Sequence, residues 1–249
     1  MTRSADFRLG LILALFVLGG FAIWAEVDPV SLSKHSIEDG PIESGSAILY
    51  AVASLGFVVA AWRSEFLRAR GSAWIYFFIG SWALLMFMFC GEEISWGQRI
   101  FQVQTPEYLM GVNKQHELNL HNIAIVDSFM GGKYRYLSIM MLTTGLLLPL
   151  LALTSFGRGL IRRFAFPVAP MGYVWLFVGA YVYGKYYAPA FKLNPDTMSN
   201  APTEVRELIL SIAMAVFAWH GAFRPNDLFR VNGAVSSERQ QGVPTPMET

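Results

Sequence analysis

The sequence AWIYFFIGSWALLMFMFC occupies residues 73–90, and GEEISWGQRI follows directly as residues 91–100. The first stretch contains no charged residue, and its length is close to the ~20 residues that a helix needs to cross ~30 Å of hydrocarbon. Two adjacent glutamates, a tryptophan, a glutamine and an arginine then follow within a few positions. This stretch therefore predicts a membrane-spanning helix that ends in a polar cluster.

The composition of the whole chain agrees with a membrane protein. Of its 249 residues 54% are hydrophobic and 15% are charged, whereas roughly a quarter of a soluble domain is charged. The net charge of +1 and the scattered basic residues give no reason to expect a nucleic-acid partner. Cys90 is the single cysteine, which excludes an intrachain disulfide and a CxxC metal or redox motif.

Apolar stretches predict an all-α fold, a polytopic bundle of about six transmembrane helices in one domain of residues 1–231. The spans are expected at about 9–25, 47–62, 73–90, 137–153, 166–183 and 205–223. The first is interpreted as an uncleaved span, because no small-x-small cleavage pattern precedes Glu26. The fifth contains Pro167 and Pro170. No internal repeat is found, so a repeat-based transporter gains no support.

The positions of the arginines predict the orientation of the bundle. Arginines occur in three groups, which precede the first span or connect later ones. The groups are Arg3 with Arg8, residues 63–70 and residues 158–163. Because basic loops resist translocation, these segments and both termini are expected in the cytoplasm, as in a bacterial inner-membrane protein. Residues 91–136 then form an outward-facing polar segment between the third and fourth spans. Residues 232–249 are expected to be a disordered cytoplasmic tail.

The outward-facing segment has its own helical signals. Thr105, Pro106 and Glu107 are typical of an N-cap, a first-turn proline and a first-turn acid, so they predict a short helix that ends near Gly111. Residues 113–123 read NKQHELNLHNI, and a helix there would place Asn113, Glu117 and His121 on one stripe. Apolar residues follow, which favours an interfacial or re-entrant segment.

The residue types of this segment allow two kinds of chemistry. Glu92 and Glu93 repel each other at a membrane boundary and lose hydration, which raises a carboxyl pKa and suits general acid and base catalysis. Arg99 would stabilise negative charge, and Glu117 would orient a histidine. A divalent metal such as zinc would be held by His116, His121 and Glu93. The histidines are five positions apart, whereas H-E-x-x-H places them four apart.

Further residues are candidates for contacts with a substrate or partner. They are Trp96, Gln98, Asn119, Asn122, Lys185 and Glu207. Glu204, Arg206 and Glu207 begin the sixth span on the outer side, where they can reach the Glu92 cluster. His220 lies roughly 20 Å deeper at 1.5 Å per residue and should not join it.

Each of these residues also has a structural interpretation. The two glutamates can be solvated or arginine-paired acids at a span end, and the histidines can be structural hydrogen-bonding groups. Trp96 and Lys185 fit an interfacial belt of aromatic and basic side chains, the asparagines fit helix caps, and Cys90 fits a packing residue.

The stretches GEEISWGQRIF, QTPE and HELNLHNI resemble a signature of a family of bacterial polytopic membrane proteins, and this resemblance implies no catalytic role. The adjacent glutamates are also similar to those of CAAX-type intramembrane proteases, which carry an arginine four residues after the second glutamate. Here Gly97 stands at that position and Arg99 follows two residues later. The histidine motifs of that family are missing, or in the case of His220 on the other side.

Two classes of function are therefore open. The first is a membrane-embedded enzyme that hydrolyses or transfers a group on a lipid or lipid-linked substrate. The second is a non-catalytic subunit that contacts other membrane proteins, or a proton-coupled transporter, in which the same polar segment is a lid or proton relay. Convergence of the candidate groups favours the first, and a closed hydrogen-bonded cluster favours the second.

Overall fold

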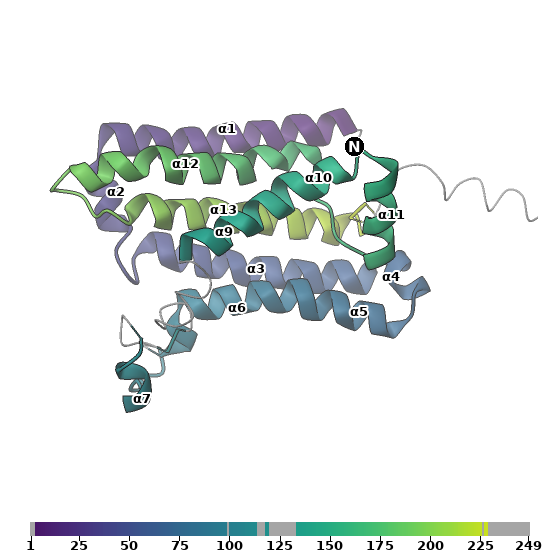
Figure 1. Cartoon of the computed structure of the whole chain (residues 1–249), viewed down its shortest axis with the longest axis horizontal. Helices are drawn as coiled ribbons and strands as arrows, with labels where there is room; N and C mark the ends of the chain where they lie inside the picture. The colour runs from purple at the N-terminus through teal and green to yellow at the C-terminus, as the bar shows by residue number, and fades with distance from the viewer. Residues whose placement is uncertain (1–2, 99, 114–117, 120–132, 226, 229–249) are drawn as a thin grey trace, which may run out of the picture.

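The computed structural model describes residues 3–98, 100–113, 118–119, 133–225 and 227–228, and it is helical without a strand in these ranges (Figure 1). The first half contains α1 (Arg3–Val27), α2 (Pro29–His35), α3 (Pro41–Arg63), α4 (Glu65–Ala69), α5 (Ser72–Phe78), α6 (Leu84–Glu93) and α7 (Glu107–Met110). The second half contains α9 (Lys133–Leu142), α10 (Leu148–Leu151), α11 (Ser155–Phe164), α12 (Val174–Leu193) and α13 (Ala201–Phe223).

Two π-helical turns, Ile79–Ala83 and Thr143–Leu147, join α5 to α6 and α9 to α10. Short 3₁₀ turns at Ser95–Gly97 and Met171–Tyr173 follow α6 and precede α12.

Four helical segments are long and apolar enough to cross a membrane. They are Asp6–Val27, Pro41–Arg63, Ser72–Glu93 and Ala201–Phe223, which correspond to the first, second, third and sixth predicted spans. The fourth predicted span corresponds to a shorter apolar helix, Ser138–Leu151. The integral membrane fold is thus supported by four helices, while the count of six and the re-entrant segment stay predictions.

The fifth predicted span is displaced toward the C-terminus. A helix was expected at 166–183, but residues 166–170 are not helical and α12 runs from Val174 to Leu193. Pro167 and Pro170 explain the shift, because proline lacks the amide proton that a helix interior requires and disfavours helical backbone in the residue before it. Lys185 therefore lies near the middle of α12 and not at its outer end, and its side chain is exposed.

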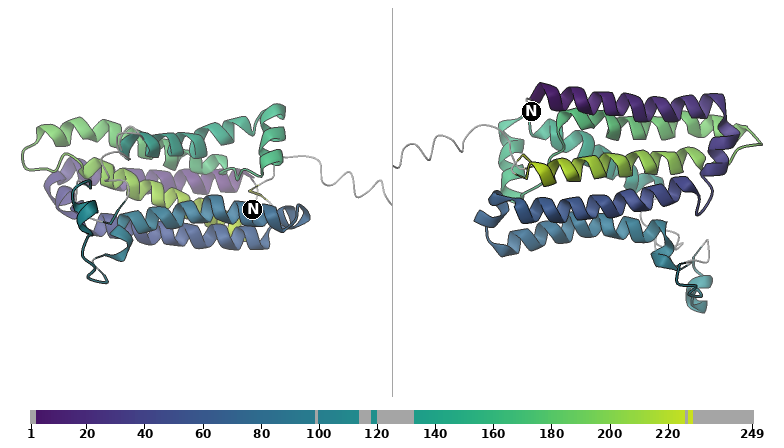
Figure 2. Two further views of the ribbon diagram at one scale, coloured as in Figure 1. Left: turned by 60° about the horizontal axis from the view of Figure 1, so that its bottom comes forward. Right: turned by 180° about the vertical axis from the view of Figure 1, so that it is seen from behind.

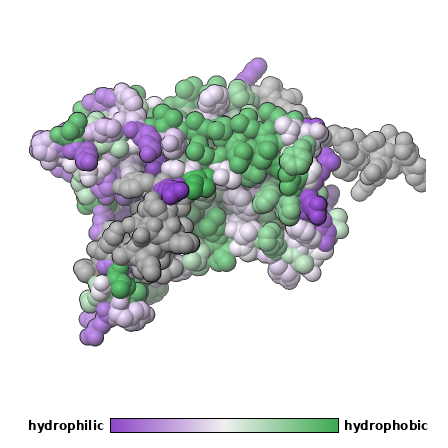
Figure 3. Space-filling model, in the orientation of Figure 1, coloured by the Kyte–Doolittle hydropathy of each residue, from purple (hydrophilic) through white to green (hydrophobic). Residues whose placement is uncertain are grey.

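The central helix of the bundle is α13, which packs between α3 and α12. The helices α6 and α1 add to the outer sides of α3 and α12, and the two views of Figure 2 show the same order. Aromatic side chains fill the core, such as Phe57 and Phe217, whose rings meet edge to face at a centroid distance of 5.5 Å. Apolar side chains of the outer helices are exposed, including Phe16 at 80%. Figure 3 shows this apolar surface over the middle of the molecule, with hydrophilic residues toward the ends, as lipid contact requires.

The two ends of the bundle carry different groups. The arginine end holds the N-terminal residues of α1, helix α4 and helix α11, so the three predicted arginine groups lie together (Figure 1). The polar end holds α2, α7, the last turn of α6 and the first turn of α13. This arrangement is the one that the charge pattern requires, and the assignment of the arginine end to the cytoplasm stays a prediction.

Candidate functional site

The stretch GEEISWGQ ends α6 with a sharp reversal of the chain. Helix α6 continues to Glu93, and the next residues Ser95, Trp96 and Gly97 have φ angles of 45°, 55° and 75°. Left-handed backbone costs a residue other than glycine of order 1 kcal/mol or more, so surrounding contacts must hold this turn. One such contact is at Gly91, where a Cβ atom would lie 2.9 Å from ring atoms of Trp96. The reversal therefore folds the indole back onto the last turn of α6.

The two adjacent glutamates point to different partners. Neighbouring residues of a helix are about 100° apart around its axis, so their side chains diverge. Glu92 accepts a hydrogen bond of 2.7 Å from the indole nitrogen of Trp96. Glu93 instead meets Glu204 and Glu207 of α13, and the ligand oxygens of these three residues all lie within 4.8 Å of one another. The sequence left open which glutamate is the reactive one, and the structure assigns Glu93 to the carboxylate cluster.

The carboxylate cluster, defined as Glu93, Glu204 and Glu207, is partly removed from solvent, with Glu93 and Glu204 half-buried and Glu207 buried. Glu207 is only 1% exposed, and the neighbouring Arg206 is 3% exposed. Gly184 of α12 makes room for this arginine, because a Cβ atom at position 184 would lie 2.8 Å from its Cδ atom. Burial of a charge costs free energy unless an opposite charge or a cation compensates it. The charged residues buried at this end of the core therefore lower the stability of the fold unless they are compensated.

Hydrogen bonds tie the chain after α6 into a compact polar network. The side-chain amide of Asn113 donates to the main-chain and side-chain oxygens of Asn119, at 2.7 and 2.9 Å. Asn119 in turn lies 3.4 Å from the hydroxyl of Ser95, and all three side chains are buried. These bonds hold Asn119, a predicted contact residue, against the turn that follows Glu93.

Gln98, another predicted contact residue, makes two bonds in the same network. Its amide nitrogen donates to the hydroxyl of Thr105 at 2.5 Å, and its oxygen accepts from the backbone amide of Leu118 at 2.8 Å. The short helix expected after Thr105 is present as α7. Its N-cap is Pro106 and not Thr105, whose hydroxyl instead accepts the hydrogen bond from Gln98. Within the predicted helix at 113–123, the described residues Asn113, Leu118 and Asn119 are not helical.

Not every predicted site residue can be placed. Arg99, His116, Glu117, His121 and Asn122 lie outside the described residues, so the predicted histidine ligands and the zinc site that they would form stay predictions. His220 lies toward the arginine end, where its Nδ1 is 3.4 Å from the hydroxyl of Tyr173, as its distance along the span predicted. The sequence interpretation expected Glu204 and Arg206 within reach of the Glu92 cluster, and Glu204 does lie beside Glu93, but neither residue was included among the site residues. The sequence feature that could have identified them is the presence of three charged residues, Glu204, Arg206 and Glu207, in the first turns of an otherwise apolar helix.

Comparison with protein-family models, with curated protein sequences and with solved structures finds no match for this chain.

Proposed function

We propose that this integral membrane protein binds a divalent cation in the carboxylate cluster. The observation that carries the proposal is the convergence of Glu93 from α6 with Glu204 and Glu207 from α13, with ligand oxygens within 4.8 Å of one another. Oxygens that share one ion at 2.3–2.6 Å can be separated by no more than about twice that distance. The spacing therefore suits a single ion between the two helices.

The chemistry of the ligands favours a hard cation. Carboxylate oxygens alone suit Mg²⁺, Mn²⁺ or Ca²⁺, whereas zinc in proteins commonly takes nitrogen or sulfur ligands. A cation would also offset the repulsion among three acids of which one is 1% exposed. The ligand argument favours an oxygen-binding ion such as Ca²⁺ or Mn²⁺ over the zinc expected from His116 and His121.

The ion would serve a membrane-embedded enzyme that acts on a lipid or lipid-linked substrate. A bound divalent ion polarises a carbonyl or phosphoryl oxygen and lowers the pKa of a bound water. Trp96, held by Glu92, and the network of Gln98 and Asn119 belong to the chain that directly follows Glu93, and we expect them to contact the substrate. Hydrolysis or transfer of a phosphoryl or acyl group at the outer surface of the membrane is the reaction class that fits this arrangement.

A second candidate function is a partner-binding lid in a non-catalytic subunit. The observation that favours it is the closed hydrogen-bonded set of Ser95, Asn113 and Asn119, whose side chains are all buried. Fully bonded polar groups specify one conformation and leave few donors for a substrate. In that case the carboxylates would have a structural or proton-carrying role.

Manganese binding tests the first proposal. The full chain, purified in detergent and treated with a chelator, is titrated with Mn²⁺ while free Mn²⁺ is followed by electron paramagnetic resonance. Saturable binding of one ion per chain is expected, and Glu207→Gln should weaken it at least about tenfold because a ligand charge is lost. The matched control is Glu92→Gln, which changes the neighbouring glutamate outside the cluster and should bind Mn²⁺ like the unmodified chain.

Two results would contradict the proposal. One is the lack of saturable binding to the folded, unmodified chain, and the other is equal binding by Glu207→Gln. Either result would leave the lid as the better explanation, and co-purification of a stoichiometric membrane partner, lost on Asn119→Leu, would then be the supporting observation.

A further inference from the structure

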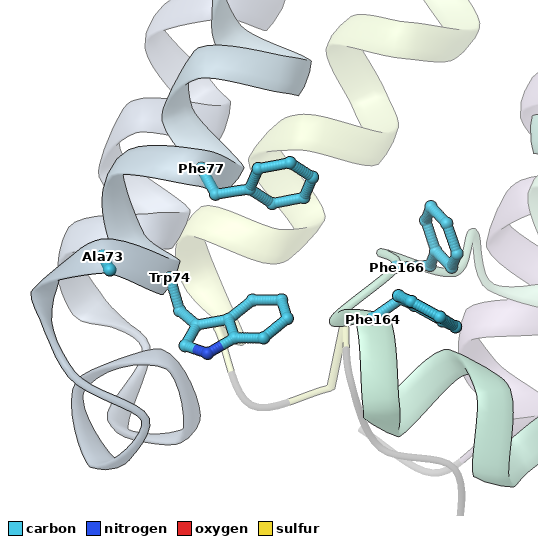
Figure 4. Close-up of a pocket in the computed structure, with 5 residues that line it drawn as sticks. All are labelled: Ala73, Trp74, Phe77, Phe164 and Phe166. Atoms are coloured by element: carbon cyan, nitrogen blue, oxygen red, sulfur yellow. The ribbon is translucent and has the colours of Figure 1, made fainter.

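An apolar pocket lies at the arginine end of the bundle, away from the carboxylate cluster. It is formed between α5 and the end of α11 and encloses about 290 Å³. Its lining residues are Ala73, Trp74, Phe77, Phe164 and Phe166. Figure 4 shows Trp74 and Phe77 pointing across the opening toward Phe164 and Phe166. The rings are not sealed in the core, since Phe77 is 59% exposed and Phe164 is 42% exposed.

Two arginines place positive charge on the walls of this pocket. The guanidinium carbon of Arg70 lies 5.1 Å from the ring centroid of Trp74 and 4.7 Å from that of Phe66. The guanidinium carbon of Arg163 lies 5.8 Å from the ring centroid of Phe164. Both walls therefore combine an aromatic face with a cation, an arrangement that holds charge beside an apolar cavity.

Arg70 also holds the two walls together. Its side chain donates to the backbone oxygen of Arg163 at 2.9 Å and to that of Arg162. These oxygens belong to the last turn of α11, where a positive charge is favourable because of the helix dipole. The pocket is thus held by a contact between segments that are far apart in the sequence.

The surroundings of the pocket combine apolar and basic side chains at one end of the bundle. Helix α11 is amphipathic, with Ile161 buried, Phe156 74% exposed and basic residues in its last turn. Arg68 adds an exposed positive charge on α4, and Glu65 of the same short helix is the neighbouring acid. An apolar opening with an excess of arginine at the end of a transmembrane bundle matches the charge pattern of an anionic lipid.

We propose that this pocket binds an anionic phospholipid, with part of one acyl chain between Trp74, Phe77 and Phe164 and the phosphate near Arg70 and Arg163. The volume is close to the lower end of the roughly 300–1,000 Å³ of small-molecule sites, so it suits a single chain segment and not a whole lipid. Guanidinium groups bind phosphate oxygens in a bidentate manner, which supplies the preference for the headgroup. This site is independent of the cation site at the other end.

Quenching of tryptophan fluorescence by brominated lipids tests the proposal. The full chain in mixed micelles receives either brominated phosphatidylglycerol, which is anionic, or phosphatidylcholine with the same brominated chains, which is zwitterionic. The signal of Trp74 is the difference between the unmodified chain and Trp74→Phe. Brominated phosphatidylglycerol should quench Trp74 at a lower mole fraction than brominated phosphatidylcholine. Arg163→Gln should reduce this preference about fivefold, which corresponds to the ~1 kcal/mol that one basic residue contributes near a membrane surface.

Two further variants separate the pocket from general charge. Ala73→Phe fills the cavity without removing a charge, and it should abolish the preference for phosphatidylglycerol. Arg8→Gln removes an exposed arginine of α1 at the same end of the bundle and should keep the preference. Thermal unfolding of each variant confirms that the chain is folded.

Three results would overturn the proposal. They are equal quenching by the two lipids, an undiminished preference in folded Ala73→Phe, and an equal loss in Arg8→Gln and Arg163→Gln. A last experiment adds inorganic phosphate, or chloride at matched ionic strength, and measures whether the quenching of Trp74 is relieved. Full relief of quenching by phosphate would show that a free anion occupies the site, which would also overturn binding of the acyl chain.

Discussion

The two ends of the bundle handle charge in opposite ways. At the polar end two charged side chains are inside, since Glu207 is 1% and Arg206 is 3% exposed between packed helices. At the arginine end they lie nearer the surface, as in the pair of Arg224 and Asp6, whose side chains are 27% and 18% exposed at a distance of 2.6 Å. Charge at a surface costs little, whereas charge in a core must be compensated. The two ends therefore differ in how strongly stability should depend on their charged side chains.

Removal of the buried arginine should give the largest effect on stability. Arg206→Met keeps an unbranched side chain but removes a positive charge that is 3% exposed and stands between Glu204 and Glu207 in the first turns of α13. Because buried charges depend on one another for compensation, removal of this one is expected to lower the free energy of unfolding by about 3–5 kcal/mol. Arg224→Met at the other end is the control, with an expected loss of about 1 kcal/mol or less. Chemical unfolding in detergent, followed by circular dichroism, measures both, and equal losses would remove the distinction between the ends.

A smaller effect is expected where the buried arginine meets α12. In Gly184→Ala the new methyl group would lie 2.8 Å from Cδ of Arg206, so the side chain or the helix must shift. Overpacking of this kind costs about 1–3 kcal/mol. Gly20→Ala in α1 provides the matched control, because no atom lies within 4 Å of the added methyl group. If both alanine variants are as stable as the unmodified chain in thermal unfolding, Arg206 is less tightly packed than its 3% exposure indicates.

The smallest effect concerns the ion pair at the arginine end. Asp6→Asn removes the carboxylate that pairs with Arg224 and should cost about 1 kcal/mol or less at low salt. Because this pair is partly accessible to solvent and salt, the cost should fall as the salt concentration approaches about 1 M. The cost of Arg206→Met should persist in the same titration, since buried charges are screened much less. A salt-independent loss in Asp6→Asn would mean that this pair also lies in a low-dielectric environment.

Much of the fold could be predicted from local sequence patterns. Long uncharged stretches located the helices that the structure gives as Asp6–Val27, Pro41–Arg63, Ser72–Glu93 and Ala201–Phe223. The arginine pattern placed α4 and α11 at one end, and the Thr105–Glu107 signals located α7. These features depend on hydropathy over one helix length or on one turn, so neighbouring residues suffice to determine them. The shift of α12 shows the limit, because an apolar stretch that contains prolines does not by itself mark where a helix begins.

The sequence by itself determined that this chain is a helical membrane protein with a polar segment after its third span, because hydrophobicity and charge act locally. Only the tertiary structure decided that Glu93, and not Glu92, meets Glu204 and Glu207. It also decided that Trp74 and Phe77 share a pocket with Phe164 and Phe166. The physical reason is the same in both cases. Which faces of two distant helices meet depends on packing and on the rotation of each helix about its axis, and the residues of a single helix do not specify either.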